Sequence, residues 1–192
     1  MFPIPDSYKT IKLVALDPGL NNIGVAVFLI DAVNLKILDI SAKTLKEGSV
    51  LDQVCLDSDY ATEQMLKRWR MVDAVMRIVR DEDPVIVVSE SPFFNRKMPS
   101  SFAVLTEVIN DIFTSILKHN NNIRIATVEP LLVKHTLGVA GQKGKDVVRC
   151  AMEKQEAILP VLKTPVSTLD EHAIDAVGVG YTFFKRRLCR EK

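Results

Sequence analysis

Two acidic side chains follow directly on apolar runs of the chain and are candidates for metal-assisted chemistry. Asp17 ends the run 11–16 and precedes a Pro-Gly turn, and Glu90 comes soon after the β-branched run 85–88. A carboxylate at the mouth of a buried strand loses hydration, which is costly unless it is paired or holds a cation. Two of them at neighbouring strand ends would also repel each other strongly. A divalent cation between them would relieve that repulsion.

Further candidate ligands lie near the start of a helix predicted over 169–185. His172 and Asp175 are three residues apart, so they share one face of that helix. Three carboxylates and an imidazole form a hard donor set suited to Mg²⁺ or Mn²⁺. Two such ions can generate a hydroxide nucleophile and stabilise the leaving oxygen of a phosphodiester. The three cysteines have no CxxC spacing, so neither a zinc ribbon nor a disulfide framework is indicated.

Each of these residues also has an ordinary structural explanation. Asp followed by Pro-Gly is typical of a turn, and a glutamate after a strand can be a surface or capping residue. His172 and Asp175 can complement a helix dipole, which is the role expected for Asp170 and Glu171. The combination of the four candidates favours a metal site over these separate explanations.

The elements that would position these residues form a mixed sheet. Apolar runs predict five strands, at 11–16, 23–30, 35–45, 85–88 and 123–128. The first three follow one another as an antiparallel meander, and the last two are separated by helices and are expected to be parallel. In such sheets the ligand site lies beyond the carboxyl ends of the parallel strands. This arrangement would bring Asp17 and Glu90 close together.

Apolar residues at helical spacing predict the helices that flank this sheet. They are expected at 61–80, from Ser100 or Ser101 to about Ile116, around Lys134, at 146–157 and at 169–185. The second of these has an apolar stripe wide enough for a dimer contact as well as for core packing. The predicted fold class is therefore α/β, with a five-stranded mixed sheet in a single domain over 1–192 that ends in a short basic tail.

The charge distribution allows a local nucleic-acid surface on a nearly neutral chain. The formal net charge is +1, but residues 91–154 contain nine Lys or Arg and five Asp or Glu. Such a surface would contact DNA phosphates in a salt-dependent way. The basic candidates for DNA contact are Arg96, Lys97, Lys143, Lys145 and Arg149. Of the two adjacent aromatic residues, Phe93 is the candidate for DNA contact and Phe94 is expected to be the buried one.

Four motifs, in this order, resemble those of the RuvC family of Holliday-junction resolvases. They are LDPGLNNIGVAV around Asp17, VSESPFF around Glu90, VKHTLGVAGQKGK at 133–145, and EHAIDA around His172 and Asp175. The resemblance extends from about Lys12 to Tyr181. It implies an RNase H-like fold, a homodimer and a Mg²⁺-dependent nuclease.

The resemblance also implies roles for individual residues. It places Asp17, Glu90, His172 and Asp175 in a catalytic set that binds two Mg²⁺ ions, for which Mn²⁺ would substitute, although the family has either Asp or His at the position of His172. Lys134 and Lys145 match catalytic basic positions beside the scissile phosphate. Phe93 matches an aromatic residue that stacks on a base at the opened crossover. The stretch 31–59 follows the family pattern loosely, so no role is transferred there.

The function implied is the resolution of four-way DNA junctions by paired, symmetric phosphodiester hydrolysis. Alternatives are an RNase H-like nuclease acting on flaps, forks or RNA/DNA hybrids, and a non-catalytic junction-binding protein. A further alternative is an actin-like sugar kinase or ATPase, which needs a second lobe for which 192 residues leave little room. A branch-migration helicase is a conceivable partner. The sequence shows neither a signal-peptide pattern nor a long uninterrupted apolar run, so we expect a reducing, cytoplasmic, DNA-associated location and no membrane partner.

Overall fold

The computed structural model describes residues 8–49, 62–94, 96, 99–142, 144 and 146–189. Its sheet has the strand order β3-β2-β1-β4-β5. The five strands are β1 (Thr10–Asp17), β2 (Asn22–Asp31), β3 (Lys36–Lys46), β4 (Ile86–Glu90) and β5 (Arg124–Val128). Neighbours among the first three are antiparallel, whereas β1 pairs with β4, and β4 with β5, in parallel. The predicted mixed sheet is confirmed.

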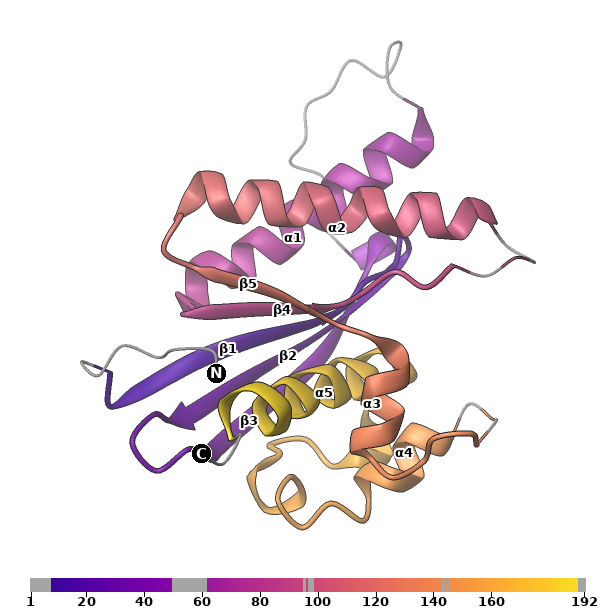
Figure 1. Cartoon of the computed structure of the whole chain (residues 1–192). Coiled ribbons are helices and arrows are strands. Elements are labelled where there is room, and N and C mark those ends of the chain that lie inside the picture. Colours follow the sequence, from indigo (N-terminus) through magenta and orange to yellow (C-terminus); the bar gives the residue numbers. More distant parts are fainter. Residues whose placement is uncertain are drawn as a thin grey trace.

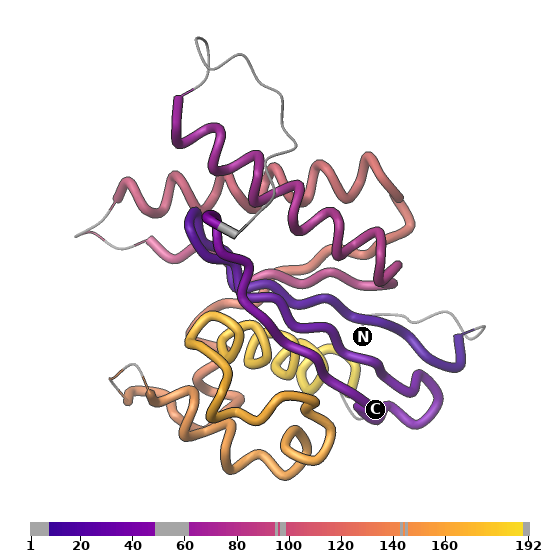
Figure 2. The backbone as a smooth tube through the Cα atoms, turned by 180° about the vertical axis from the view of Figure 1, so that it is seen from behind, coloured from indigo at the N-terminus to yellow at the C-terminus, as the bar shows by residue number. Residues whose placement is uncertain are grey.

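Helices cover both faces of the sheet. The α-helices are α1 (Glu63–Glu82), α2 (Pro99–His119), α3 (Pro130–Thr136), α4 (Val147–Met152) and α5 (Glu171–Phe183). Helices α1 and α2 lie together on one side of the sheet, while α5, accompanied by α3 and α4, lies on the other (Figure 1). The same three layers are visible from behind (Figure 2). Short 3-10 turns at Glu47–Ser49, Leu159–Val161 and Val166–Thr168, and a π-helical turn at Phe184–Leu188, complete the described elements.

Strand β1 contributes side chains to both of the apolar cores that result. Ile11, Leu13 and Ala15 belong to the core under α5, whereas Val14 and Leu16 belong to the core under α1 and α2. Successive side chains of a strand point to opposite faces, so a central strand covered on both sides must be apolar at nearly every position. The uninterrupted apolar run that precedes Asp17 in the sequence follows from this double coverage.

Helix α2 is apolar along most of its length. By length and composition alone it would suffice to cross a membrane. Its inner face packs in the core shared with the sheet and α1 through Val108, Ile112 and Ile116. It also carries Glu107 and Asp111, which form ion pairs with Arg68 of α1. These contacts are those of a helix packed in a layered domain.

Two local predictions were wrong. The helix expected at 146–157 ends at Met152. Beyond it the chain forms tight turns, in which Lys154 N donates to Ala151 O and Gln155 N donates to Met152 O, each three residues back. These turns bring Ile158, which is 0% exposed, into the core under α5. Phe94 was expected to be buried but is 54% exposed, and its ring makes an edge-on contact with Phe102 of α2.

Candidate active site

The parallel pairing of β1 with β4 brings Asp17 and Glu90 together. Leu16 pairs with Ser89, so the residue after each of them stands at the same edge of the sheet. Burial, and then the nearby charges of Asp17 and Asp175, raise the pKa of Glu90 to about 8. Asp17 and Glu90 are therefore close together, as their positions at the strand ends predict. At neutral pH, burial and the neighbouring charges favour the protonated form of Glu90.

Helix α5 begins directly over these strand ends. Its N-cap is Asp170, whose side chain accepts a hydrogen bond from Ala173 N (3.1 Å). In the first turn, His172 Nδ1 donates to Asp17 Oδ2 over 2.9 Å, since a carboxylate can only accept. This hydrogen bond raises the pKa of the His172 imidazole above its ordinary value. His172 and Asp17 are thus joined although they are 155 residues apart in the chain.

Asp175 is one turn further along the same face of α5. Burial, and then the charge of Asp17, raise its pKa to about 7. Lys134 of α3 is near enough to favour the ionised forms of both Asp175 and Glu90. Glu90, Lys134 and Asp175 line a common pocket of about 290 Å³. The structure therefore gathers the four predicted ligands and one of the two predicted catalytic lysines.

The donor set suits a hard divalent cation in its chemistry. Three carboxylates that repel one another in a half-buried site are stabilised as anions by such an ion, and a neutral imidazole can join them. No three His, Cys, Asp or Glu side chains are already arranged to hold a metal within the described ranges. Asp17 is instead engaged with His172. Binding of a cation would therefore compete with this hydrogen bond and with the proton of Glu90.

Gly24 was missed by sequence reasoning, although it governs how closely α5 approaches the sheet. It lies on β2 directly opposite Asp17 in the antiparallel ladder. A Cβ at this position would lie 1.9 Å from the carbonyl oxygen of His172 and 2.4 Å from its carbonyl carbon. Only glycine lets the first turn of α5 reach the strand beside Asp17. The sequence shows a glycine within an apolar run but not which helix lies over it.

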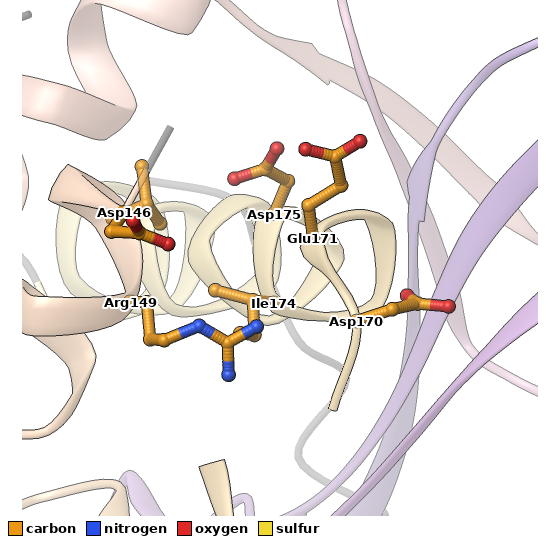
Figure 3. A pocket seen from close by; sticks show the side chains of 7 residues that line it. Asp146, Arg149, Asp170, Glu171, Ile174 and Asp175 are labelled. Carbon is orange, nitrogen blue, oxygen red and sulfur yellow. The ribbon is translucent and has the colours of Figure 1, made fainter. Parts of the chain in front are cut away.

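Side chains from two other elements hold the segment that leads into α5. Thr44 of β3 donates a hydrogen bond to the N-cap carboxylate of Asp170. Arg149 of α4 donates from Nη1 to Val166 O (2.6 Å) and from Nη2 to Leu169 O (2.8 Å). Figure 3 shows the neighbouring pocket of about 420 Å³, with the carboxylates of Glu171 and Asp175 directed to one side of the view and the guanidinium of Arg149 toward the other. Neither contact has a local sequence signal.

Only some of the other residues predicted to contact DNA are among those that the structure describes. Phe93 is 71% exposed on the loop after β4, and Arg96 is also exposed. Lys97, Lys143 and the second predicted catalytic lysine, Lys145, lie outside the described residues. The roles of all these residues remain predictions.

Gly19, in the turn between β1 and β2, has a structural reason to lack a side chain. A Cβ there would lie 2.4 Å from the backbone oxygen of Asn22. The turn itself therefore requires a glycine, whether or not a ligand approaches it.

Glu90→Gln is expected to flatten the pH dependence of stability in protein without divalent metal. The pKa of Glu90 is about 8 in the folded chain against an ordinary value of 4.5. The stability that the protonated Glu90 contributes to the folded chain is therefore fully present below about pH 4.5 and is lost as the pH rises toward about 8. A neutral glutamine does not ionise, so at pH 8 the variant should be more stable than wild type by on the order of 2 kcal/mol.

Urea unfolding in EDTA between pH 5 and pH 8.5 measures this difference. Glu129→Gln is the matched control, because Glu129 is an exposed glutamate near the same edge of the sheet. It should retain the wild-type slope. Equal slopes for wild type and Glu90→Gln would contradict the buried, repelled state of Glu90.

Comparison with known proteins identifies the fold. No protein-family model matches the chain, and no curated protein matches it. Thermus thermophilus RuvC in complex with Holliday junction substrate superposes with a TM-score of 0.58 at 17% identity, covering 93% of this chain and 96% of that one. The yeast mitochondrial Holliday junction resolvase superposes with a TM-score of 0.60 at 11% identity, covering 97% of this chain and 82% of that one. The fowlpox virus Holliday junction resolvase superposes with a TM-score of 0.52 at 13% identity, covering 91% of this chain and 98% of that one. The chain has the RNase H-like fold of these resolvases.

Proposed function

We propose that this protein is a structure-selective endonuclease that resolves four-way DNA junctions by metal-assisted phosphodiester hydrolysis. The observation that carries the proposal is the set of mutually repelling carboxylates at one sheet edge, Asp17, Glu90 and Asp175, joined by His172 and faced by Lys134. A fold that serves only as a scaffold has no reason to keep this costly set in a half-buried site. The similarity in fold to Holliday junction resolvases supports the same function.

Each side chain has a role in this proposal. Asp17, Glu90, His172 and Asp175 would hold Mg²⁺, or Mn²⁺ in its place, with two ions per site, which would supply an activated water and stabilise the leaving oxygen. In the metal-free chain the proton on His172 Nδ1 offsets the charge of Asp17. Lys134, beside Glu90 and Asp175, would bind the phosphate next to the cleaved bond. The exposed ring of Phe93 would stack on a base, and Arg96 would contact the backbone.

The protein would act as a homodimer, because a four-way junction presents two symmetric strands to be cut. Helix α2 supports this part of the proposal. Its outer face includes the exposed apolar side chains of Ala103 and Leu117, the latter 49% exposed. A second copy placed two-fold symmetrically on this helix would cover apolar surface on both protomers.

Cleavage of a synthetic four-way junction, compared with a linear duplex of the same sequence, tests the proposal. With Mg²⁺ the junction should be nicked symmetrically in two strands and the duplex should stay intact, and without Mg²⁺ neither should be cut. Y-forks, flaps and RNA/DNA hybrids belong in the same experiment. Equal rates on these substrates would replace the proposal by a broader branched-nucleic-acid nuclease, and binding without cleavage would make the protein a junction-binding factor.

A further inference from the structure

The segment that leads into helix α5 is fastened to the rest of the protein by Arg149. Its guanidinium donates two hydrogen bonds, to the carbonyl oxygens of Val166 (2.6 Å) and Leu169 (2.8 Å). A charged, planar donor that binds two acceptors at once is among the stronger polar contacts available to a protein. Val166 and Leu169 are also joined to each other, by the hydrogen bond from Leu169 N to Val166 O. Arg149 therefore holds both ends of one tight turn.

This turn immediately precedes the helix that carries two of the proposed metal ligands. Leu169 is adjacent to the N-cap Asp170, and His172 follows in the first helical turn. Asp170 is itself held from the other side by Thr44 of β3. The start of α5 thus lies between Arg149 on α4 and Thr44 on β3, with Gly24 beneath it. A small movement of the turn would be passed directly to His172 and Asp175.

We propose that Arg149 is a positioning residue for these ligands and not a contact to DNA. The geometry supports this role, because two of the guanidinium N–H groups are directed at backbone carbonyls. In Figure 3 the guanidinium also lies away from the carboxylates of Glu171 and Asp175. The inference rests on the proposed function, since positioning matters only if the acidic set binds metal and cleaves DNA.

Arg149→Met and Arg149→Lys test the proposal against a matched control. Methionine keeps the aliphatic length but loses both hydrogen bonds, whereas lysine keeps the charge and can restore one. Lys154→Met is the control, because Lys154 is exposed just beyond α4 and its loss removes the same charge. Each protein is assayed for single-turnover cleavage at saturating enzyme, for the Mg²⁺ midpoint of cleavage, and for junction affinity as a function of salt in EDTA.

For Arg149→Met we expect cleavage at saturation to fall at least about tenfold and the Mg²⁺ midpoint to rise several-fold. Junction affinity and its salt dependence should stay at wild-type values. Arg149→Lys should recover part of the rate, and Lys154→Met should match wild type throughout. A smaller salt slope with an unchanged rate at saturation would identify Arg149 as a phosphate contact and overturn the proposal. Unchanged rate, midpoint and salt slope would overturn it as well.

Hydrogen exchange separates a failure of this inference from a failure of the proposed function. The amides of Ala173 and Ile174 donate to the side chain and the backbone carbonyl of Asp170, so their protection reports the start of α5. They should exchange faster in Arg149→Met than in Lys154→Met even if the wild-type protein cleaves no junction. Equal exchange in the two variants would remove the structural basis of the proposal. If Arg149→Met does not fold, the exchange rates of Ala173 and Ile174 in Arg149→Lys are compared with those in wild type. Faster exchange in Arg149→Lys supports the proposal, and equal exchange overturns it.

Discussion

Asp17→Asn is expected to lower the rate of junction cleavage at least about 1,000-fold, which corresponds to roughly 4 kcal/mol of lost transition-state stabilisation. Asp17 is the residue through which the other members of the set interact. It accepts the hydrogen bond of His172, and its charge raises the pKa values of both Glu90 and Asp175. Asparagine has nearly the same shape but cannot supply the charge. Single-turnover cleavage of a labelled junction in saturating Mg²⁺ measures the loss.

The same variant should bind the junction within about threefold of the wild-type affinity, because phosphate contacts supply most of the binding energy. Its His172 should also titrate at lower pH in an NMR experiment, since the hydrogen bond to Asp17 is the largest cause of the raised pKa of His172. Asp81→Asn is the control, because Asp81 is exposed on α1, across the sheet from α5. Cleavage by Asp17→Asn near the wild-type rate would contradict the assignment of the active site.

Gly24→Ala is expected to abolish most cleavage and to destabilise the fold by about 2–4 kcal/mol. The added methyl group would lie 1.9 Å from the carbonyl oxygen of His172, so either α5 or β2 must move. Strand β2 is fixed between β1 and β3, so the first turn of α5 is the part that yields. Its displacement would break the hydrogen bond between His172 and Asp17. Urea unfolding and single-turnover cleavage measure the two effects.

Two other glycines separate positioning from general loss of stability. A Cβ at Gly180 of α5 would lie 2.2 Å from the ring of Phe28 on β2, so Gly180→Ala should also be destabilising. This contact lies two helical turns beyond His172, and the folded fraction of that variant should still cleave. Gly48→Ala should be near neutral, because a Cβ added there would meet no atom of the described residues within 4 Å. A Gly24→Ala protein that folds and cleaves normally would refute the close-approach argument.

The sheet and its acidic edge were predictable because their signals are local. An apolar run buried on both faces, followed by a carboxylate, marks the end of β1 and of β4, and parallel pairing then joins Asp17 to Glu90. The spacing of His172 and Asp175 likewise predicts a shared helical face. What was missed depends on packing between distant segments. The end of α4 at Met152 is decided by the burial of Ile158, and the roles of Gly24 and Arg149 are decided by which backbone atoms lie opposite them.

Because β1 supplies side chains to both apolar cores, the two layers of the molecule should unfold in one cooperative transition. The residues just before Asp17 are part of this arrangement, since Ala15 packs in one core and Leu16 in the other. The electrostatic cost of the acidic edge consequently lowers the global stability of the metal-free protein, and any cation that removes the cost should raise the melting temperature of the whole fold.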